Sequence, residues 1–351
     1  MILRLAIDKV RIAVVGAGLI GRRHARSIRR HDGSVLTAIV DLTDSAQEFA
    51  DDIGVPLYKS MAEMLDAHRP DGVIVATPNQ MHLEHGLMAI EADLPTLIEK
   101  PIADSAAAAE TLANAAAAAN VPLLIGHHRR HNPLIADAKA KIDSGALGDI
   151  VAVNAMFWLY KPDNYFEVEW RRKPGAGPVY INLIHDIDLL RWLIGEVVTV
   201  RAVQSTSTRG HEVEDTAGAL LTFANGAIGT ITASDSIVAP WSWEHTAGEN
   251  PAYPETDQHC YLIGGTKGSL SLPNGEVWSQ EGPRSWWREF QRSGPATRSD
   301  ADPLDHQIGH FCEVIRGEAS PIVSGHEGLQ TLRVIEALKQ SAETSEIRTL
   351  I

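Results

Sequence analysis

The stretch that decides the fold is RIAVVGAGLIG, residues 11–21. An apolar, β-branched run leads directly into glycines in the pattern G-x-G-x-x-G, and a helical pattern follows. Such a turn lets a pyrophosphate approach the backbone, and the helix that it opens presents free N–H groups and a positive dipole. Asp41 closes the next β-rich run about 20 residues further on, where a carboxylate accepts hydrogen bonds from ribose hydroxyls. This context favours a dinucleotide site over a glycine-rich turn without a ligand.

The carboxylate of Asp41 also bears on the choice of cofactor. It would repel the 2′-phosphate of NADP, which favours NAD, while Arg22 and Arg23 lie nearby in the sequence and would soften this preference. The residues of the turn that we expect to hold the cofactor are Gly16, Gly18, Leu19, Ile20 and Gly21.

The first third of the chain alternates β-rich runs with helical patterns. The β-rich runs lie at residues 11–18, 35–41, 71–79, 95–101 and 121–127. The helical patterns lie at residues 20–30, 45–52, 61–68, 81–92 and 105–120. Such alternation predicts an α/β domain of the Rossmann type, with a doubly wound parallel sheet covered by helices on both faces.

Beyond residue 127 the pattern changes. A helical pattern at 132–145 is followed by runs at 197–208, 216–236 and 260–273 that alternate with period two. Period-two alternation is typical of an antiparallel sheet with one face covered, and a last helical pattern follows at 325–343. We therefore predict two domains, a dinucleotide-binding domain at 1–126 and a second, α+β domain at 127–351.

Composition and charge exclude several classes of protein. The chain has 351 residues, which suits two domains, and a net charge of −14, which would repel nucleic acids and anionic membranes. It contains two cysteines, far apart in the sequence, so we expect no disulfide scaffold. The N-terminus lacks the layout of a signal peptide, and no apolar run is long enough to span a membrane. These features predict a cytoplasmic location.

One helical pattern carries an unusual number of polar residues. In YINLIHDIDLLRW, residues 180–192, Asn182, His185 and Asp188 follow one another at intervals of three and so share a face. Buried polar groups are costly unless they have partners or a function. We interpret Asp186 as a capping or salt-bridging residue, because it points elsewhere on the helix.

By several motifs the sequence resembles the Gfo/Idh/MocA family, named for glucose–fructose oxidoreductase, inositol dehydrogenase and a rhizopine-catabolism protein. The matching pieces, in chain order, are GAGLIGRRH with His24, ATPNQMH with Asn79 and His82, EKPIA with Glu99, Lys100 and Pro101, GHHRRHNP with Arg129 and Arg130, SGALGDI, and H-x-x-D at His185 and Asp188. The resemblance implies a Rossmann domain followed by an α/β domain with a large open, mainly antiparallel sheet, whose outer face often forms the interface of a homodimer or homotetramer.

The resemblance also implies a chemistry, in which a nicotinamide in the cleft between the domains exchanges a hydride with a carbon that bears a hydroxyl. Lys100 follows a β-rich run at its carboxyl end, where α/β sheets bind ligands, and its ammonium would stabilise alkoxide charge. His185 corresponds to the family's proton-shuttling histidine, and imidazole exchanges protons near neutral pH. We expect these two residues to be catalytic. The alternatives are that Lys100 is an ordinary surface lysine and that His185 is a histidine of the core.

The sequence departs from the family pattern at one position. Many relatives carry an aspartate four residues before the histidine, where this chain has Ile181. Either Lys100 and His185 suffice, or Asn182 orients the substrate while His185 takes the proton, or the reaction is not ordinary alcohol oxidation. We favour the second interpretation.

Further residues are expected to line the site. For the substrate these are Asn182, Asp188, Arg129 and Trp170. For the cofactor they are Thr77, Pro78, Asn79, His82, Glu99, Lys100 and Arg171. We expect no metal site at His127, His128 and His131, because the family uses none. The Trp-rich loop at 240–254 is either a substrate loop or a packed surface loop.

Three functions are compatible with these residues. The preferred one is an NAD(P)-dependent dehydrogenase for a secondary alcohol of a sugar, cyclitol, related polyol or cyclic diol. The second is a lyase or glycosidase-type enzyme that uses NAD without net oxidation, which net release of NADH would exclude. The third is a nucleotide-binding regulator without catalysis, which Ile181 favours and the intact Lys100 and His185 oppose.

Overall fold

The computed structural model describes residues 8–294 and 302–350, which form two compact units. The first unit comprises the described part of Met1–His131 and also Asp302–Leu332, whereas the second comprises the described parts of Asn132–Ala301 and Arg333–Ile351. This division differs from the predicted boundary at residue 126, because Asp302–Leu332 returns to the first unit. Ion pairs hold the returning segment: Arg23 to Asp302 at 3.1 Å and Arg30 to Asp305 at 2.6 Å.

The first unit is built on a parallel six-stranded sheet. Its strands are β1 (Val10–Val15), β2 (Ser34–Val40), β3 (Leu57–Tyr58), β4 (Gly72–Val75), β5 (Thr96–Ile98) and β6 (Leu123–Ile125). The strand order β3-β2-β1-β4-β5-β6 reverses direction between β1 and β4. Every pairing in the sheet is parallel. The predicted doubly wound Rossmann sheet is therefore confirmed, and its switch point lies between β1 and β4, where such sheets bind ligands.

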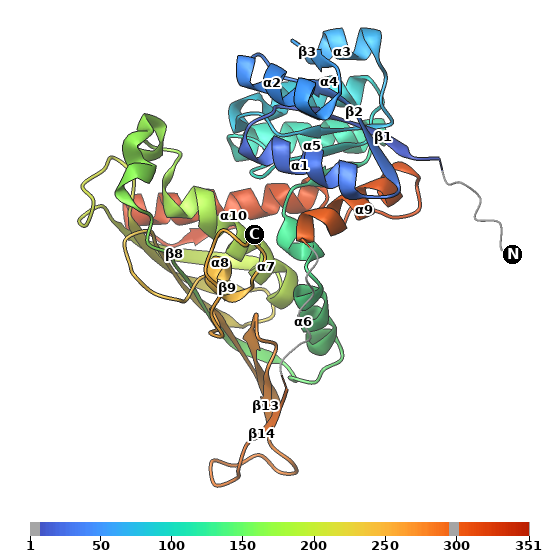
Figure 1. Cartoon of the computed structure of the whole chain (residues 1–351). Coiled ribbons are helices and arrows are strands. Elements are labelled where there is room, and N and C mark those ends of the chain that lie inside the picture. Colours follow the sequence, from blue (N-terminus) through green and yellow to red (C-terminus); the bar gives the residue numbers. More distant parts are fainter. Residues whose placement is uncertain (1–7, 295–301, 351) are drawn as a thin grey trace, which may run out of the picture. The chain divides into compact units, whose positions relative to one another are not determined.

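Helices connect these strands, and Figure 1 shows the sheet (blue to teal) packed among them. The helices are α1 (Leu19–Arg30), α2 (Asp44–Ile53), α3 (Met61–Ala67), α4 (His82–Glu91), α5 (Ala106–Ala119) and α9 (Pro303–Ile315), with short 3₁₀ turns η1 (Asn79–Met81) and η2 (His128–His131). Serine side chains cap α3 and α5, since Ser60 accepts from Glu63 N and Ser105 from Ala108 N. Apart from α9, these helices agree within one or two residues with the predicted patterns.

The second unit is built on a nine-stranded sheet. Its strands are β7 (Ile150–Trp158), β8 (Val197–Ser205), β9 (Thr216–Phe223), β10 (Ile228–Ser234), β11 (Tyr261–Gly265), β12 (Gly268–Leu272), β13 (Val277–Ser279), β14 (Gln291–Ser293) and β15 (Arg348–Thr349). The order is β14-β13-β12-β11-β7-β10-β9-β8-β15. Only β7 and β10 pair in parallel among these strands. The sheet is thus mainly antiparallel, as predicted. Figure 1 shows the β13–β14 hairpin projecting from the rest of the sheet.

Helices cover one face of this sheet. Those that contribute to its core are α6 (Pro133–Asp143), η5 (Val179–Leu183), α7 (Ile184–Ile194), α8 (Trp243–Thr246) and α10 (Gly325–Thr344), which enters this unit at Arg333. The short turns η3 (Asp163–Glu167) and η4 (Glu169–Arg172) also belong to this unit. The core contains inward residues of the strands, such as Phe157 and Tyr261, packed with Ile187 and Leu190 of α7. No described helix, in either unit, has the length and apolar character needed to cross a membrane.

The predicted helix at 180–192 has a different beginning from the one expected. Its first turn, η5, is a π-helix, and the regular α-helix α7 begins only at Ile184. A π-helical turn is wider than an α-helical turn and is frequent at functional sites. Asn182 lies in η5 and His185 in α7, so the two residues belong to helices of different winding, and the spacing of an unbroken α-helix does not relate their faces.

Candidate active site

The glycine turn after β1 forms a cradle that leaves room for a ligand. Gly16 has φ +95°, and a Cβ there would lie 2.6 Å from the carbonyl oxygen of Ala76. A Cβ on Gly21 would lie 1.9 Å from the carbonyl oxygen of Gly16, so this glycine allows α1 to pack against the turn. A Cβ on Gly18 would meet nothing within 4 Å, and Gly18, as the N-cap residue of α1, provides no side-chain hydrogen bond to the first turn. The open space and the uncapped helix N-terminus fit a pyrophosphate.

Asp41 lies at the end of β2, beside this cradle. Its Oδ2 accepts from Ala17 N at 2.7 Å, and its Oδ1 accepts from Thr43 N at 2.8 Å and from the Thr43 hydroxyl at 2.7 Å. Burial raises the pKa of this carboxyl, but these hydrogen bonds outweigh burial and hold the pKa below its ordinary value. Asp41 is thus a fixed negative charge at the place where the dinucleotide fingerprint needs a ribose acceptor.

Arg22 lies close to Asp41 in the structure, as its sequence position suggested. Its Nε donates to Ala17 O at 2.8 Å, and its NH2 group donates to Ser45 O at 2.7 Å. Its guanidinium also stacks on Phe49, 5.0 Å from the ring centre. Arg22 therefore lies between the glycine turn and the start of α2, whereas Arg23 pairs with Asp302.

The segment from the end of β4 to the first residue of α4 contains four predicted cofactor residues, and they differ in exposure. Pro78 is exposed, Thr77 and Asn79 are half-buried, and His82 is 1 % exposed. His82 Nδ1 lies 2.8 Å from Pro101 O, and its Nε2 lies 2.8 Å from Thr77 O. Burial lowers the pKa of His82, although both carbonyls and the charges of Glu99 and Asp104 act against this effect.

The segment after β5 carries the predicted catalytic lysine. Lys100 is half-buried and follows Glu99 at the carboxyl end of the strand, and the Lys100–Pro101 peptide bond is cis. Glu99 is 6 % exposed, and its Oε1 accepts from His24 Nε2 at 2.6 Å. Burial raises the pKa of Glu99, but the hydrogen bond and charge of His24 and the charges of Lys100 and His128 lower it to about 2. The carboxylate is therefore ionised.

In the second unit, the polar residues of α7 are all buried. His185 is 7 % exposed, Asp188 1 % and Asp186 0 %. The Tyr261 hydroxyl donates to Asp186 Oδ1, so Asp186 is a buried hydrogen-bond acceptor in the first turn of α7, and its capping or salt-bridging role stays a prediction. Asn182 is half-buried, and its Oδ1 has no hydrogen-bond partner among the described residues.

The remaining predicted residues have varied surroundings. Arg129 is only 2 % exposed, whereas Trp170 is 55 % exposed on η4. Arg171 donates to Tyr165 O at 2.9 Å, and its guanidinium lies 4.1 Å from the centre of the Tyr165 ring. Arg171 is therefore held against Tyr165 within the second unit.

Several residues that hold these segments have no signal in the sequence. His24 was quoted as part of a motif, but nothing in the sequence indicated that it bonds Glu99. The buried Glu214 accepts from Val179 N at 3.2 Å at the start of η5 and from Lys339 Nζ at 2.6 Å. Such partners are distant in the sequence, so a single sequence contains no signal for them.

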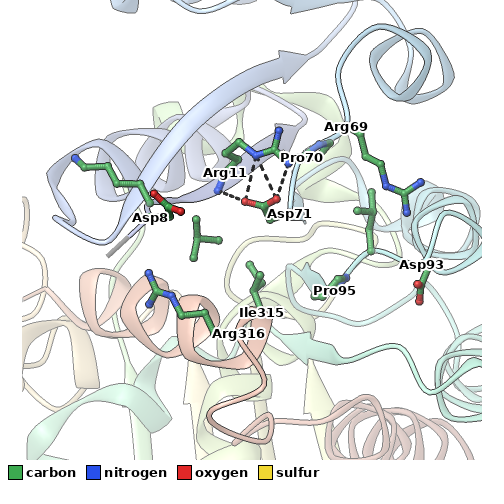
Figure 2. Close-up of a pocket in the computed structure, with 12 residues that line it drawn as sticks. Asp8, Arg11, Arg69, Pro70, Asp71, Asp93, Pro95, Ile315 and Arg316 are labelled. Carbon is green, nitrogen blue, oxygen red and sulfur yellow. Dashed lines mark hydrogen bonds and ion pairs between the residues drawn. The ribbon is translucent and has the colours of Figure 1, made fainter. Parts of the chain in front are cut away.

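The first unit also has a pocket at the opposite edge of its sheet, where β1, β4 and β5 begin. Its volume is about 610 Å³, and Figure 2 shows charged side chains around it. Arg11 pairs with Asp71 at 2.6 Å, Arg69 donates to Ala92 O at 2.5 Å, and Arg316 donates to Gly33 O at 3.1 Å. Sheets of this type bind their ligands at the carboxyl edge, so this pocket is distinct from the cofactor cradle.

Comparisons with known proteins agree with this geometry. Residues 10–127 match the family model described as "Oxidoreductase family, NAD-binding Rossmann fold", and residues 135–271 match the GFO/IDH/MocA C-terminal domain. Inositol 2-dehydrogenase of Rubrobacter xylanophilus is 30 % identical over 68 % of this chain and 67 % of its own length. The rhizopine catabolism protein MocA of Rhizobium meliloti is 28 % identical over 94 % of each chain.

Among solved structures, the WlbA dehydrogenase of Bordetella pertussis in complex with NADH and UDP-GlcNAcA is 25 % identical, with a TM-score of 0.79 over 98 % of this chain and 99 % of the other. The glycine cradle, the N-terminal family match and the NADH in this solved structure agree on a nicotinamide cofactor. The chain therefore belongs to the Gfo/Idh/MocA family of NAD(P)-dependent oxidoreductases, which act on CH–OH groups.

Proposed function

We propose that this enzyme oxidises a secondary alcohol of a sugar or cyclitol, with Lys100 and His185 as its catalytic residues. The observation that carries the proposal is the position of Lys100. It follows β5 directly at the carboxyl edge of the sheet, the same edge that holds the glycine cradle after β1 and Asp41 after β2. A relative, the enzyme of Rubrobacter xylanophilus, is an inositol 2-dehydrogenase, which supports a cyclic polyol as substrate.

The cofactor residues in this proposal begin with those of the glycine cradle. Gly16, Gly18, Leu19, Ile20 and Gly21 would hold the pyrophosphate, and Asp41 would accept from the adenosine ribose. Thr77, Pro78 and Asn79, from the loop after β4, would line the nicotinamide end. Bound NAD supplies the acceptor for the hydride that leaves the carbinol carbon.

The protein's own residues would handle the proton. The ammonium of Lys100 would donate a hydrogen bond to the substrate hydroxyl and stabilise the alkoxide charge that develops as the hydride leaves. His185 would accept the hydroxyl proton, because imidazole titrates near neutral pH. Asn182 would orient a second hydroxyl, and its Oδ1 has no hydrogen-bond partner in the described part of the chain. Ile181 cannot accept a proton, so the proposal assigns none to it. Asp188, Arg129 and Trp170 complete the proposed substrate contacts.

A substrate screen tests this proposal. Purified enzyme is assayed with NAD and with NADP against a panel of inositols, aldoses, polyols and cyclic cis-diols, by absorbance of the reduced nicotinamide. We expect oxidation of at least one compound, and loss of about three orders of magnitude in kcat in both Lys100→Met and His185→Asn, as general acid–base and electrostatic contributions combine. NADH affinity should be retained in His185→Asn. Equal turnover in Lys100→Met and the wild type would refute the assignment.

We further propose that the enzyme works as a homodimer or homotetramer in the cytoplasm. The outer face of the nine-stranded sheet supports the assembly, because one row across neighbouring strands contains Leu262, Asn154, Thr230, Leu220 and Arg201. A face with exposed leucines and few charges suits contact with another copy. Two buried free thiols, Cys260 and Cys312, suit a reducing compartment.

A further inference from the structure

Glu99 stands next to the proposed catalytic lysine, but its carboxylate is turned into the protein. Oε1 accepts from His24 Nε2 at 2.6 Å, and Oε2 accepts from the backbone N–H of Lys100 at 3.2 Å. The side chain of His24 is fully buried, and that of Glu99 is 8 % exposed. A cofactor ligand would direct its polar atoms toward the ligand. Glu99 instead uses both oxygens within the first unit.

The partner of Glu99 belongs to the helix that begins in the cofactor cradle. His24 lies in α1, which starts at Leu19 directly after the glycine turn. The His24–Glu99 bond therefore connects the pyrophosphate-binding helix to the residue before Lys100. A buried, charge-assisted hydrogen bond is stronger and geometrically more definite than an exposed one.

The residue after Lys100 is held in a similar way. The ring of buried His82, at the start of α4, lies between Pro101 O and Thr77 O, at 2.8 Å from each. Carbonyl oxygens only accept, so a neutral ring donates to one of them and a protonated ring to both. The residues on either side of Lys100 are thus held by two buried histidines, His24 from α1 and His82 from α4, two of the helices that begin at the ligand-binding edge of the sheet.

Gly126 completes the surroundings of Glu99. A Cβ on Gly126 would lie 2.9 Å from Glu99 Oε1 and 3.0 Å from its Cδ. The same Cβ would lie 3.1 Å from the Glu99 Cα, so alanine at this position would displace the carboxylate and press on the backbone of Glu99, without changing either hydrogen-bonding partner. Gly126 does not have a positive φ, so the substitution introduces no backbone strain.

We infer that Glu99 is a positioning residue, which together with His24 and His82 fixes the backbone of Lys100 relative to the cofactor helix. This inference rests on the proposed function, because it presumes that Lys100 acts on the substrate. It differs from a role for Glu99 or His82 in binding the cofactor directly. Misplacing a reacting group by about 1 Å can cost a hundredfold in rate. The hydrogen bonds of His24 and His82 on either side of Lys100 therefore matter for kcat.

The test compares Glu99→Gln and Gly126→Ala with Lys100→Met, and with Gly294→Ala as a control in which the new Cβ meets nothing within 4 Å. We expect Glu99→Gln and Gly126→Ala to lower kcat by about tenfold to a hundredfold, with NADH affinity, measured by fluorescence titration, within about threefold of wild type. Hydrogen exchange of peptides that cover residues 96–104 should be faster in both variants, by about tenfold. Gly294→Ala should match the wild type in every measurement.

The pH profile separates an electrostatic role from a packing role. Glu99→Gln removes a negative charge that favours the Lys100 ammonium, so the pH dependence of kcat/KM should move to lower pH. Gly126→Ala keeps the negative charge of Glu99. His24 on α1 and His128 on η2 remain the other titratable groups that face this carboxylate. The profile of Gly126→Ala should therefore move less.

Three outcomes would overturn the inference. If kcat and hydrogen exchange in both variants equal those of the wild type, the hydrogen bonds on either side of Lys100 do not position it. A fall in NADH affinity as large as the fall in kcat/KM would make Glu99 a cofactor ligand. Unchanged exchange at residues 96–104 would refute the structural connection even if activity fell. If exchange rises but Lys100→Met keeps full turnover, the positioning stands and the proposed function fails.

Discussion

At the scale of single residues, we expect Asp41 to determine which cofactor the cradle accepts. Its carboxylate is held by three donors and would repel a 2′-phosphate, while Arg22 is close enough to attract one once that charge is removed. We predict that Asp41→Asn lowers the ratio of kcat/KM for NAD to kcat/KM for NADP by at least about tenfold, which is about 1.4 kcal/mol.

The control for this prediction is Asp52→Asn, which changes the net charge equally at an exposed position of α2. Its cofactor ratio should equal that of the wild type within about twofold, since an exposed charge that contacts no ligand is largely screened by solvent. An unchanged ratio in Asp41→Asn would mean that the carboxylate does not face the ribose.

A second prediction at this scale concerns Glu99 and the pH dependence of the free energy of unfolding. Its pKa is about 2 in the folded chain, below the ordinary value of 4.5, because the hydrogen bond and charge of His24 and the charges of Lys100 and His128 outweigh burial. A lowered pKa means that the carboxylate stabilises the fold fully above pH 4.5 and loses this contribution as the pH falls toward 2. We predict that urea unfolding shows Glu99→Gln less stable than wild type near neutral pH, by no more than about 3 kcal/mol, and that this difference shrinks steadily in acid. A difference that grows in acid would contradict the assigned ionisation.

At the scale of elements, the π-helical turn η5 depends on a buried ion pair. Glu214 accepts hydrogen bonds from the backbone N of Val179, the first residue of η5, and from Nζ of Lys339 on α10, at 2.6 Å. The side chain of Glu214 is 0 % exposed. Lys339→Met would leave this carboxylate buried without its cation, which typically costs about 3–5 kcal/mol. We predict a loss of this size in the free energy of urea unfolding, because the start of the helix that carries Asn182 and His185 is then held by an unpaired charge.

A matched control exists within the same unit. Lys173 pairs with Glu212 at 2.7 Å, nearly the same distance, but the two side chains are 44 % and 60 % exposed. Lys173→Met should lower the free energy of unfolding far less than Lys339→Met, because solvent screens an exposed pair. If both substitutions have equal effects, burial of Glu214 is not what makes its pair important.

Comparison of the elements shows which features the sequence could predict. The helices between the strands of the first sheet and the glycine cradle follow local signals, namely periodicity and turn residues, so they were predicted within a residue or two. The return of Asp302–Leu332, the bond from Tyr261 to Asp186 and the His24–Glu99 pair each join residues that are distant in the chain. The π-helical turn was missed because its residues have the same apolar spacing as an α-helix. Local pattern therefore places Lys100 on the correct edge, but the contacts that hold it require the tertiary structure.

At the scale of the whole molecule, a net charge of −14 disfavours the approach of two copies, so an interface must use a surface with few acidic groups. The outer face of the nine-stranded sheet is such a surface. Leu220 is 45 % exposed, Ile228 51 % and Leu262 44 %, while Thr230 and Asn154 between them are neutral. Exposed apolar residues gathered on one sheet face are more often a contact surface than apolar residues scattered singly.

We predict that Leu220→Arg shifts the protein to a smaller species, because it places an unpaired, desolvated charge on that face, opposite Arg201. Light scattering coupled to size-exclusion chromatography gives the mass directly, and the shift should be largest at micromolar protein concentration. Val238→Arg, at an apolar position that is 84 % exposed and lies outside the strands, introduces the same charge and should leave the mass unchanged. A wild-type mass equal to that of one chain would refute assembly altogether. An unchanged oligomer in Leu220→Arg would instead assign the contact to another surface, since the charge could then be accommodated in solvent.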